Sequence, residues 1–110
     1  MKPIKVKPKP SRSENQGVRA DVVKFLKASG WEVVKNHGSA YSRAGWPDLF
    51  CYRRRPPWTT MLIETKRAGE EPTELQRREI ERITAAGGCA AVVHSLEELL
   101  TLMKKWEIEP

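Results

Sequence analysis

Two apolar segments separated by a short stretch rich in arginine and proline constrain the fold of this chain most strongly. The segments are predicted strands at about Asp48 to Arg53 and about Thr59 to Lys66. The residues that connect them, Arg53 to Trp58, suffice only for a turn. A turn of this length joins neighbouring antiparallel strands, so the two segments predict a β-hairpin.

Periodic patterns elsewhere place helices and further strands around this hairpin. Apolar residues at helical spacing predict helices, and short apolar or alternating runs predict strands. The predicted elements are a helix from about Ser11 or Ser13 to Ser29, a strand at 31–35, the two hairpin strands, a helix opened by a capping box at 73–76, a strand at 89–94 and a helix opened by a second capping box at 95–98. The order α-β-β-β-α-β-α predicts a single compact α/β domain with a mixed central sheet flanked by helices.

Each predicted helix carries an apolar stripe that should face the core. The stripes are Val18, Val22, Phe25 and Leu26 in the first helix, Leu75, Ile80, Ile83 and Ala86 in the second, and Leu96, Leu99, Leu100 and Met103 in the third. Continuing the first stripe back by one turn gives Glu14, an acid in line with the buried face.

The positive charge of the chain suggests a polyanionic partner. Of the formal net charge of +6, four units come from lysines in residues 1–10, which leaves about +2 (6 − 4) for residues 11–110. Residues 1–10 are predicted to form a flexible basic tail rich in lysine and proline, and residues 11–110 the folded domain. The tail fits either a solvated leader or an electrostatic arm along a nucleic-acid backbone, and charge alone does not choose between them.

The cysteines and the hydropathy pattern narrow the class of protein. Cys51 and Cys89 are the only cysteines, and each lies in an apolar run that predicts a reduced, buried thiol. Without a CxxC pair the pattern does not favour zinc. No apolar run approaches the length of a signal peptide or a membrane span, so we expect a soluble, intracellular protein.

Three polar residues at the open end of the hairpin carry the chemistry. Glu64 and Lys66 should share one side of a strand, because side chains alternate along it, and the hairpin can bring Asp48 beside them. Carboxylates that hold Mg²⁺ promote phosphodiester cleavage, since the ion polarises the phosphate and acidifies a bound water. The backbone carbonyl of Thr65 is a candidate third ligand. The alternative is structural: Glu64 and Lys66 form a charge ladder, and Asp48 caps a turn after Pro47.

The order and spacing of several short motifs are more specific than any one of them. The motifs are Gly45-Trp46-Pro47-Asp48-Leu49, Ile63-Glu64-Thr65-Lys66, Gln76 on the following helix, and Ser95-Leu96-Glu97-Glu98-Leu99. Over about residues 11–105 the chain resembles the VRR-NUC (virus-type replication-repair nuclease) domain of the PD-(D/E)XK nuclease superfamily. The resemblance implies a restriction-endonuclease-like fold.

Carried over residue by residue, the resemblance implies an active site. Asp48 and Glu64 become the metal ligands, Lys66 the catalytic lysine and Gln76 a site residue on the next helix. Glu14 corresponds to the acid on the first helix that contacts the metal through water. Both Glu14 and Gln76 also fit a capping box, so a purely structural role stays open for each.

Position 65 is commonly aliphatic in this motif, and the threonine found here is expected to face away from the metal.

Four arginines are candidates for binding phosphates: Arg43, Arg53, Arg54 and Arg55. For the last three, a solvated turn is the alternative.

Together these features predict a DNA nuclease that uses Mg²⁺ or Mn²⁺. The resemblance implies that it is a structure-selective endonuclease that cuts branched DNA such as four-way (Holliday) junctions. The resemblance also implies a homodimer, which would present two active sites to two strands. We expect the protein in the cytoplasm of a bacterial or phage-infected cell. The alternatives are a non-catalytic DNA-binding module of the same fold, and a nuclease of the same superfamily that acts on another nucleic acid.

Overall fold

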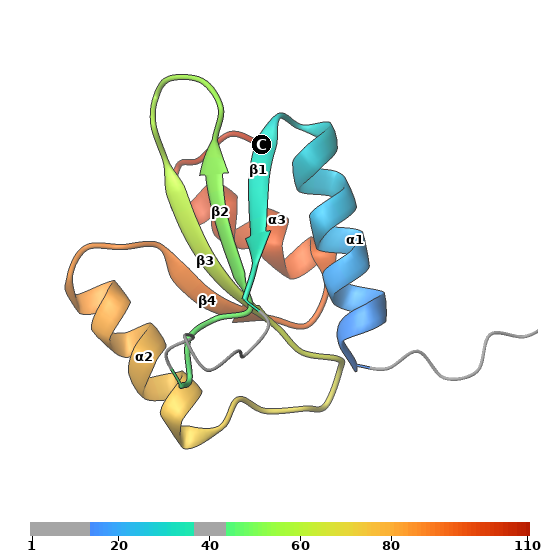
Figure 1. Cartoon of the computed structure of the whole chain (residues 1–110), viewed down its shortest axis with the longest axis vertical. Coiled ribbons are helices and arrows are strands. Elements are labelled where there is room, and N and C mark those ends of the chain that lie inside the picture. The colour runs from blue at the N-terminus through green and yellow to red at the C-terminus, as the bar shows by residue number, and fades with distance from the viewer. Residues whose placement is uncertain (1–13, 37–43) are drawn as a thin grey trace, which may run out of the picture.

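The computed structural model describes residues 14–36 and 44–110, which contain three helices and four strands (Figure 1). The elements are α1 (Glu14–Ala28), β1 (Trp31–Lys35), β2 (Leu49–Arg53), β3 (Thr60–Thr65), α2 (Glu74–Ala85), β4 (Ala90–Val93) and α3 (Leu96–Lys105). This order and the bounds, to within a few residues, agree with the prediction from sequence. Side chains are described from Gly17 onward, so the side chain of Glu14 lies outside the described part.

The four strands form one mixed sheet in the order β1-β2-β3-β4. The pairs β1–β2 and β2–β3 are antiparallel, whereas β3–β4 is parallel. In the β2–β3 hairpin Leu49 lies opposite Ile63, and the chain continues past this pair with Asp48 on one strand and Glu64 on the other. The predicted hairpin is therefore confirmed, and its open end places the two acids side by side.

Helices α1 and α3 cover the same face of the sheet and contact each other, as Figure 1 shows. The core between them is formed by Val22 and Leu26 of α1, Leu99 and Met103 of α3, and the inward residues Leu49, Cys51, Met61, Ile63 and Val93 of the sheet. Burying one such side chain stabilises the fold by about 1.5–3 kcal/mol. Cys51 is fully buried and Cys89 is partly buried, and both are free thiols.

Helix α2 departs from its predicted packing. Helix α2 packs mainly against β4, at the edge of the sheet (Figure 1). Leu75 is therefore 47% exposed and Ala86 is exposed, while Ile80 and Ile83 are half-buried. The prediction that Leu75 and Ala86 face the core is wrong, because a single edge strand covers only a narrow side of the helix.

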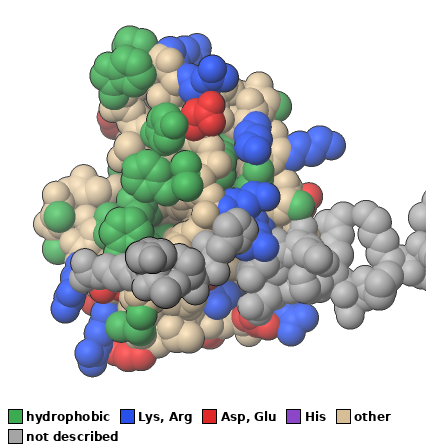
Figure 2. Space-filling model, in the orientation of Figure 1, with side chains coloured by type: hydrophobic (Ala, Val, Ile, Leu, Met, Phe, Trp, Pro, Cys, Tyr) green, Lys and Arg blue, Asp and Glu red, His purple; other side chains and the backbone are tan. Residues whose placement is uncertain are grey.

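Because α2 lies at the β4 edge, part of the second face of the sheet is not covered by a helix. Figure 2 shows hydrophobic side chains gathered on this face. The exposed large hydrophobic residues over the strands and the hairpin turn are Val34, Tyr52 and Trp58, and the ring of Phe50 lies 6.0 Å from that of Tyr52. None of the helices in residues 14–36 and 44–110 is long and apolar enough to cross a membrane.

Candidate active site

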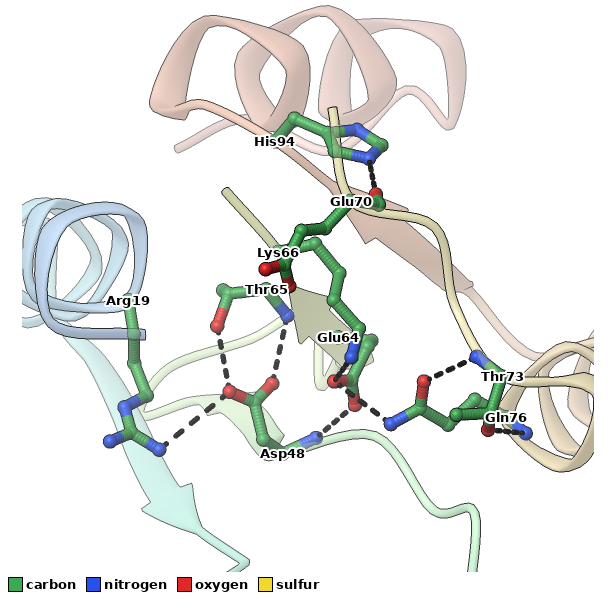
Figure 3. A network of polar contacts seen from close by, with 9 residues as sticks. All are labelled: Arg19, Asp48, Glu64, Thr65, Lys66, Glu70, Thr73, Gln76 and His94. Atoms are coloured by element: carbon green, nitrogen blue, oxygen red, sulfur yellow. Dashed lines mark hydrogen bonds and ion pairs between the residues drawn. The ribbon is translucent and has the colours of Figure 1, made fainter. Parts of the chain in front are cut away.

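Asp48 and Glu64 meet at the open end of the β2–β3 hairpin (Figure 3). The main-chain N–H of Asp48 donates a hydrogen bond to Oε1 of Glu64 over 3.1 Å. Asp48 lies in a bend directly before β2, and Glu64 is the penultimate residue of β3. The hairpin therefore brings the two acids together, as the sequence predicts.

Thr65 holds the carboxylate of Asp48 with two hydrogen bonds. Its main-chain N–H donates to Oδ1 over 2.9 Å, and its hydroxyl donates to Oδ2 over 2.7 Å. The expectation that the Thr65 side chain faces away from the site is wrong. Asp48 lies in a bend rather than within the strand, so its carboxylate can reach the side of β3 on which the fully buried Thr65 lies.

Two side chains contact the second oxygen of Glu64. Nζ of Lys66 lies 3.7 Å from Oε2, which agrees with the prediction that Glu64 and Lys66 share one side of the strand. Nε2 of Gln76 donates to the same oxygen over 3.3 Å. Gln76 also completes the capping box of α2, since its Oε1 accepts from the N–H of Thr73. The capping role and the contact with the site therefore coexist.

Arg19 of α1 is a site residue that the sequence analysis missed. Its Nη1 lies 3.8 Å from Oδ2 of Asp48 (Figure 3). A signal for it was present, because the buried residues Val22, Val23 and Leu26 form a stripe that leads back to Arg19 at helical spacing. A basic residue in line with a buried stripe indicates an oppositely charged partner at the end of the sheet, as an acidic residue in that position does.

Burial and mutual repulsion disfavour charge on the two acids. Burial raises the pKa of Asp48, although hydrogen bonds from Thr65 and the nearby Arg19 partly oppose this. Burial, and then the neighbouring charge of Asp48, raise the pKa of Glu64 to about 7, against an opposing effect of Lys66. A pair of carboxylates with raised pKa values is favoured in its charged form by a bound cation.

The donor chemistry fits a hard cation such as Mg²⁺. Asp48 and Glu64 supply carboxylate oxygens, which this class of ion prefers, and it often retains several waters beside one or two protein carboxylates. Among the described residues no three His, Cys, Asp or Glu side chains cluster in a way that could hold a metal ion. Any further ligand is therefore a water, a backbone, amide or hydroxyl oxygen, or an acid outside the described side chains, such as Glu14.

The family of the chain follows from comparison with known proteins. The sequence profile of the VRR-NUC domain matches residues 11–97. The chain belongs to the VRR-NUC family. A solved structure described as a VRR_NUC domain is 27% identical, with a TM-score of 0.67 over 80% of this chain and 91% of that one.

A second solved structure, a VRR_NUC domain protein, shares the fold of this VRR-NUC domain. It is 19% identical, with a TM-score of 0.63 over 88% of this chain and 89% of that one. No curated protein sequence matches the chain. VRR-NUC is a nuclease-type domain, typically metal-dependent, so membership supports a nuclease function in general and a DNA partner.

The arginines predicted to bind phosphates differ in their accessibility in this VRR-NUC domain. Arg54 and Arg55 are exposed in the hairpin turn, and Nε of Arg54 lies 3.5 Å from Oε1 of Glu32. Arg53 is only 8% exposed, and its guanidinium lies over the ring of Trp31 at 5.2 Å from the centroid. Arg53 is therefore not available to a phosphate in this conformation, because its side chain points from β2 into the core. Arg43 lies outside the described residues.

Proposed function

We propose that this VRR-NUC protein is a metal-dependent DNA endonuclease that hydrolyses phosphodiester bonds at branched DNA such as four-way junctions. The observation that carries the proposal is the grouping of Asp48, Glu64 and Lys66 at one end of the hairpin. A structural charge ladder requires only Glu64 and Lys66. Here the main-chain N–H of Asp48 also binds the Glu64 carboxylate, so the two acids form one anionic site.

Asp48 and Glu64 would hold a divalent cation, Mg²⁺ or Mn²⁺, with the carbonyl of Thr65 as a further ligand and Glu14 in contact through water. Such an ion polarises the phosphoryl group and lowers the pKa of a bound water. Thr65 fixes the orientation of the Asp48 carboxylate through both of its oxygens. A carboxylate oxygen that accepts one hydrogen bond keeps a second lone pair, so these bonds leave Asp48 able to bind a cation.

Lys66 acts on the reacting groups themselves, whereas Gln76 positions Glu64. In the reaction a water attacks phosphorus and loses one proton, the bond from phosphorus to the leaving oxygen breaks, and the leaving oxygen gains one proton. The ammonium group of Lys66, 3.7 Å from Glu64, orients the attacking water and stabilises negative charge that develops on the phosphoryl oxygens. Gln76 holds Glu64 in place from α2.

The hairpin turn offers a surface for the DNA backbone. Arg54 and Arg55 are exposed there, and backbone contacts of this kind position a duplex without reading its sequence. The basic tail at residues 1–10 adds charge that would steepen the salt dependence of binding. Selection of branched DNA would then come from the relative positions of two such surfaces.

A homodimer would supply the second surface. Val34, Tyr52 and Trp58 are 52%, 39% and 75% exposed on or beside the open face of the sheet. Covering these side chains with a second copy of the chain would remove apolar surface from water. Light scattering on the purified protein tests this: we expect a dimer, and a shift toward monomer for Tyr52→Lys. A monomer at all concentrations would contradict it.

A cleavage panel tests the catalytic proposal. The wild type should cut labelled four-way junctions in Mg²⁺ or Mn²⁺ in preference to linear duplex, flap and RNA substrates. Asp48→Asn, Glu64→Gln and Lys66→Ala should each reduce the rate by about 100-fold or more. Variants that cut as well as the wild type would overturn the site assignment. DNA binding without cleavage and without carboxylate-dependent metal binding would favour the non-catalytic module, and cleavage of RNA alone would favour another substrate.

A further inference from the structure

We propose that Arg19 is an exchangeable counter-cation of the site: it neutralises Asp48 while no metal is bound and turns to a phosphate of the nucleic acid when the metal binds. This inference rests on the proposed nuclease function and assigns a second anion-binding group to the same site. It concerns a residue of α1, an element that the sequence motifs link to the site only through Glu14.

The first step is the pairing of charges. Each acid has one cation at similar range: Lys66 lies 3.7 Å from Oε2 of Glu64, and Arg19 lies 3.8 Å from Oδ2 of Asp48. Two ionised acids and two cations give a formal charge of zero (−2 + 2). A divalent cation would leave this group at +2, an excess that an anionic phosphate and a deprotonated attacking water would offset.

The second step is the difference between the two cations. Lys66 directly follows β3, its main-chain N–H donates to the carbonyl of Val93, and its side chain is 11% exposed, so it is held beside Glu64. Arg19 reaches the site from a separate element, and its side chain is 26% exposed. At 3.8 Å its Nη1 is beyond hydrogen-bond distance of Asp48, whose Oδ2 already accepts from the Thr65 hydroxyl. The attraction is therefore mainly Coulombic, and it agrees with the lowering effect of Arg19 on the pKa of Asp48.

The third step is the chemistry of the guanidinium group. Its planar set of donors matches the oxygens of a phosphate and can bind two of them at once. Because Arg19 is partly exposed and makes no short hydrogen bond to Asp48, its movement toward a phosphate breaks none there. In this scheme the metal ion and Arg19 compete for the carboxylate of Asp48. Metal binding releases Arg19 to bind a phosphate, so the metal ion strengthens DNA binding.

Two measurements test the exchange. The first is calorimetric titration with Mg²⁺, and the second is binding of a labelled DNA junction with Ca²⁺ in place of Mg²⁺. Arg19→Met keeps the aliphatic stem but removes the charge. It should tighten Mg²⁺ binding by about threefold to tenfold, since the competing cation is partly exposed and screened. The same variant should weaken DNA binding by about tenfold and lower the salt slope by about one. Opposite effects on the two affinities are not expected from loss of a structural contact.

Two further variants separate charge from geometry. Arg19→Lys keeps the charge, so Mg²⁺ binding should stay at the wild-type level while DNA binding weakens with the loss of the planar donors. Lys24→Met removes a positive charge from an exposed position of the same helix and should leave Mg²⁺ binding unchanged.

Unchanged Mg²⁺ and DNA affinities in Arg19→Met, with normal binding by the wild type, would overturn this inference alone. A wild type that binds no divalent cation would overturn the proposed function and this inference with it.

Discussion

Thr65 donates two hydrogen bonds to Asp48, one from its main-chain N–H to Oδ1 and one from its hydroxyl to Oδ2, at 2.9 and 2.7 Å. The residue between the acid and the lysine of the Glu-x-Lys motif thus fixes the acid of the other motif. An aliphatic residue at this position would provide only the main-chain bond. The hydroxyl is the part of the contact that depends on the side chain.

Thr65→Val should therefore loosen Asp48 without changing the volume of the core. We expect a loss of stability of about 1 kcal/mol, typical of one buried hydrogen bond. Because the Asp48 carboxylate would then be less firmly oriented, Mg²⁺ binding should also weaken and cleavage should fall by about tenfold, as for other residues that orient metal ligands. Urea unfolding and calorimetric titration measure the two effects.

Thr65→Ser is the matched control, because it keeps the hydroxyl and should bind Mg²⁺ more nearly like the wild type. Equal Mg²⁺ affinity in the valine and serine variants would show that the hydroxyl does not position Asp48.

Gln76 has two separable tasks. Its Oε1 accepts from the N–H of Thr73 in the capping box, and its Nε2 donates to Glu64. Gln76→Glu keeps the acceptor and loses the donor, so α2 should stay capped while cleavage falls. Thr73→Ala does the reverse: it should cost about 1 kcal/mol of stability and leave the bond to Glu64 in place.

Thermal unfolding and single-turnover cleavage of both variants measure the two tasks. If Gln76→Glu cleaves at the wild-type rate, the contact with Glu64 has no part in the reaction.

The raised pKa of Glu64 predicts how stability depends on pH in the metal-free protein. The folded form has a pKa of about 7 against an ordinary value of 4.5, so it binds the proton more tightly than the unfolded chain. The stabilisation is complete below about pH 4.5 and is lost as the pH rises through about 7, up to roughly 3 kcal/mol in all. Because the cation requires the charged form, Mg²⁺ binding should strengthen over the same window.

Urea unfolding in EDTA between pH 4.5 and 8 checks this, with Glu64→Gln as the reference. The difference in unfolding free energy between the wild type and the variant should become less favourable to the wild type as the pH rises. A difference independent of pH would show that Glu64 titrates normally.

The helices, the strands and the hairpin were predicted well because residue patterns within each short segment determine them. The turn at Arg53 to Trp58 determined the hairpin, and the hairpin brought Asp48 to Glu64. The incorrect expectations depended on packing that no local pattern encodes. The exposure of Leu75 follows from the narrow contact of α2 with β4, and the Thr65–Asp48 contact follows from a bend that takes Asp48 out of the strand.

Gly45, which opens the Gly-Trp-Pro-Asp motif, explains how that motif is held against α2. Its φ is +80°, and a Cβ there would lie 2.7 Å from Cγ and 2.9 Å from the carbonyl oxygen of Leu75. Gly45→Ala should thus combine backbone strain with a collision, and cost about 2–4 kcal/mol. The displacement should also move Asp48, three residues later, and reduce Mg²⁺ affinity.

Gly69→Ala is the control, since its φ is +87° but nothing lies within 4 Å of the added Cβ. It should show the strain alone, about 1 kcal/mol, with Mg²⁺ affinity near that of the wild type. Chemical denaturation and calorimetry on the two variants distinguish strain from collision. Equal losses of stability in both would mean that Leu75 yields to the new methyl group, and that its contact with Gly45 does not fix the position of Asp48.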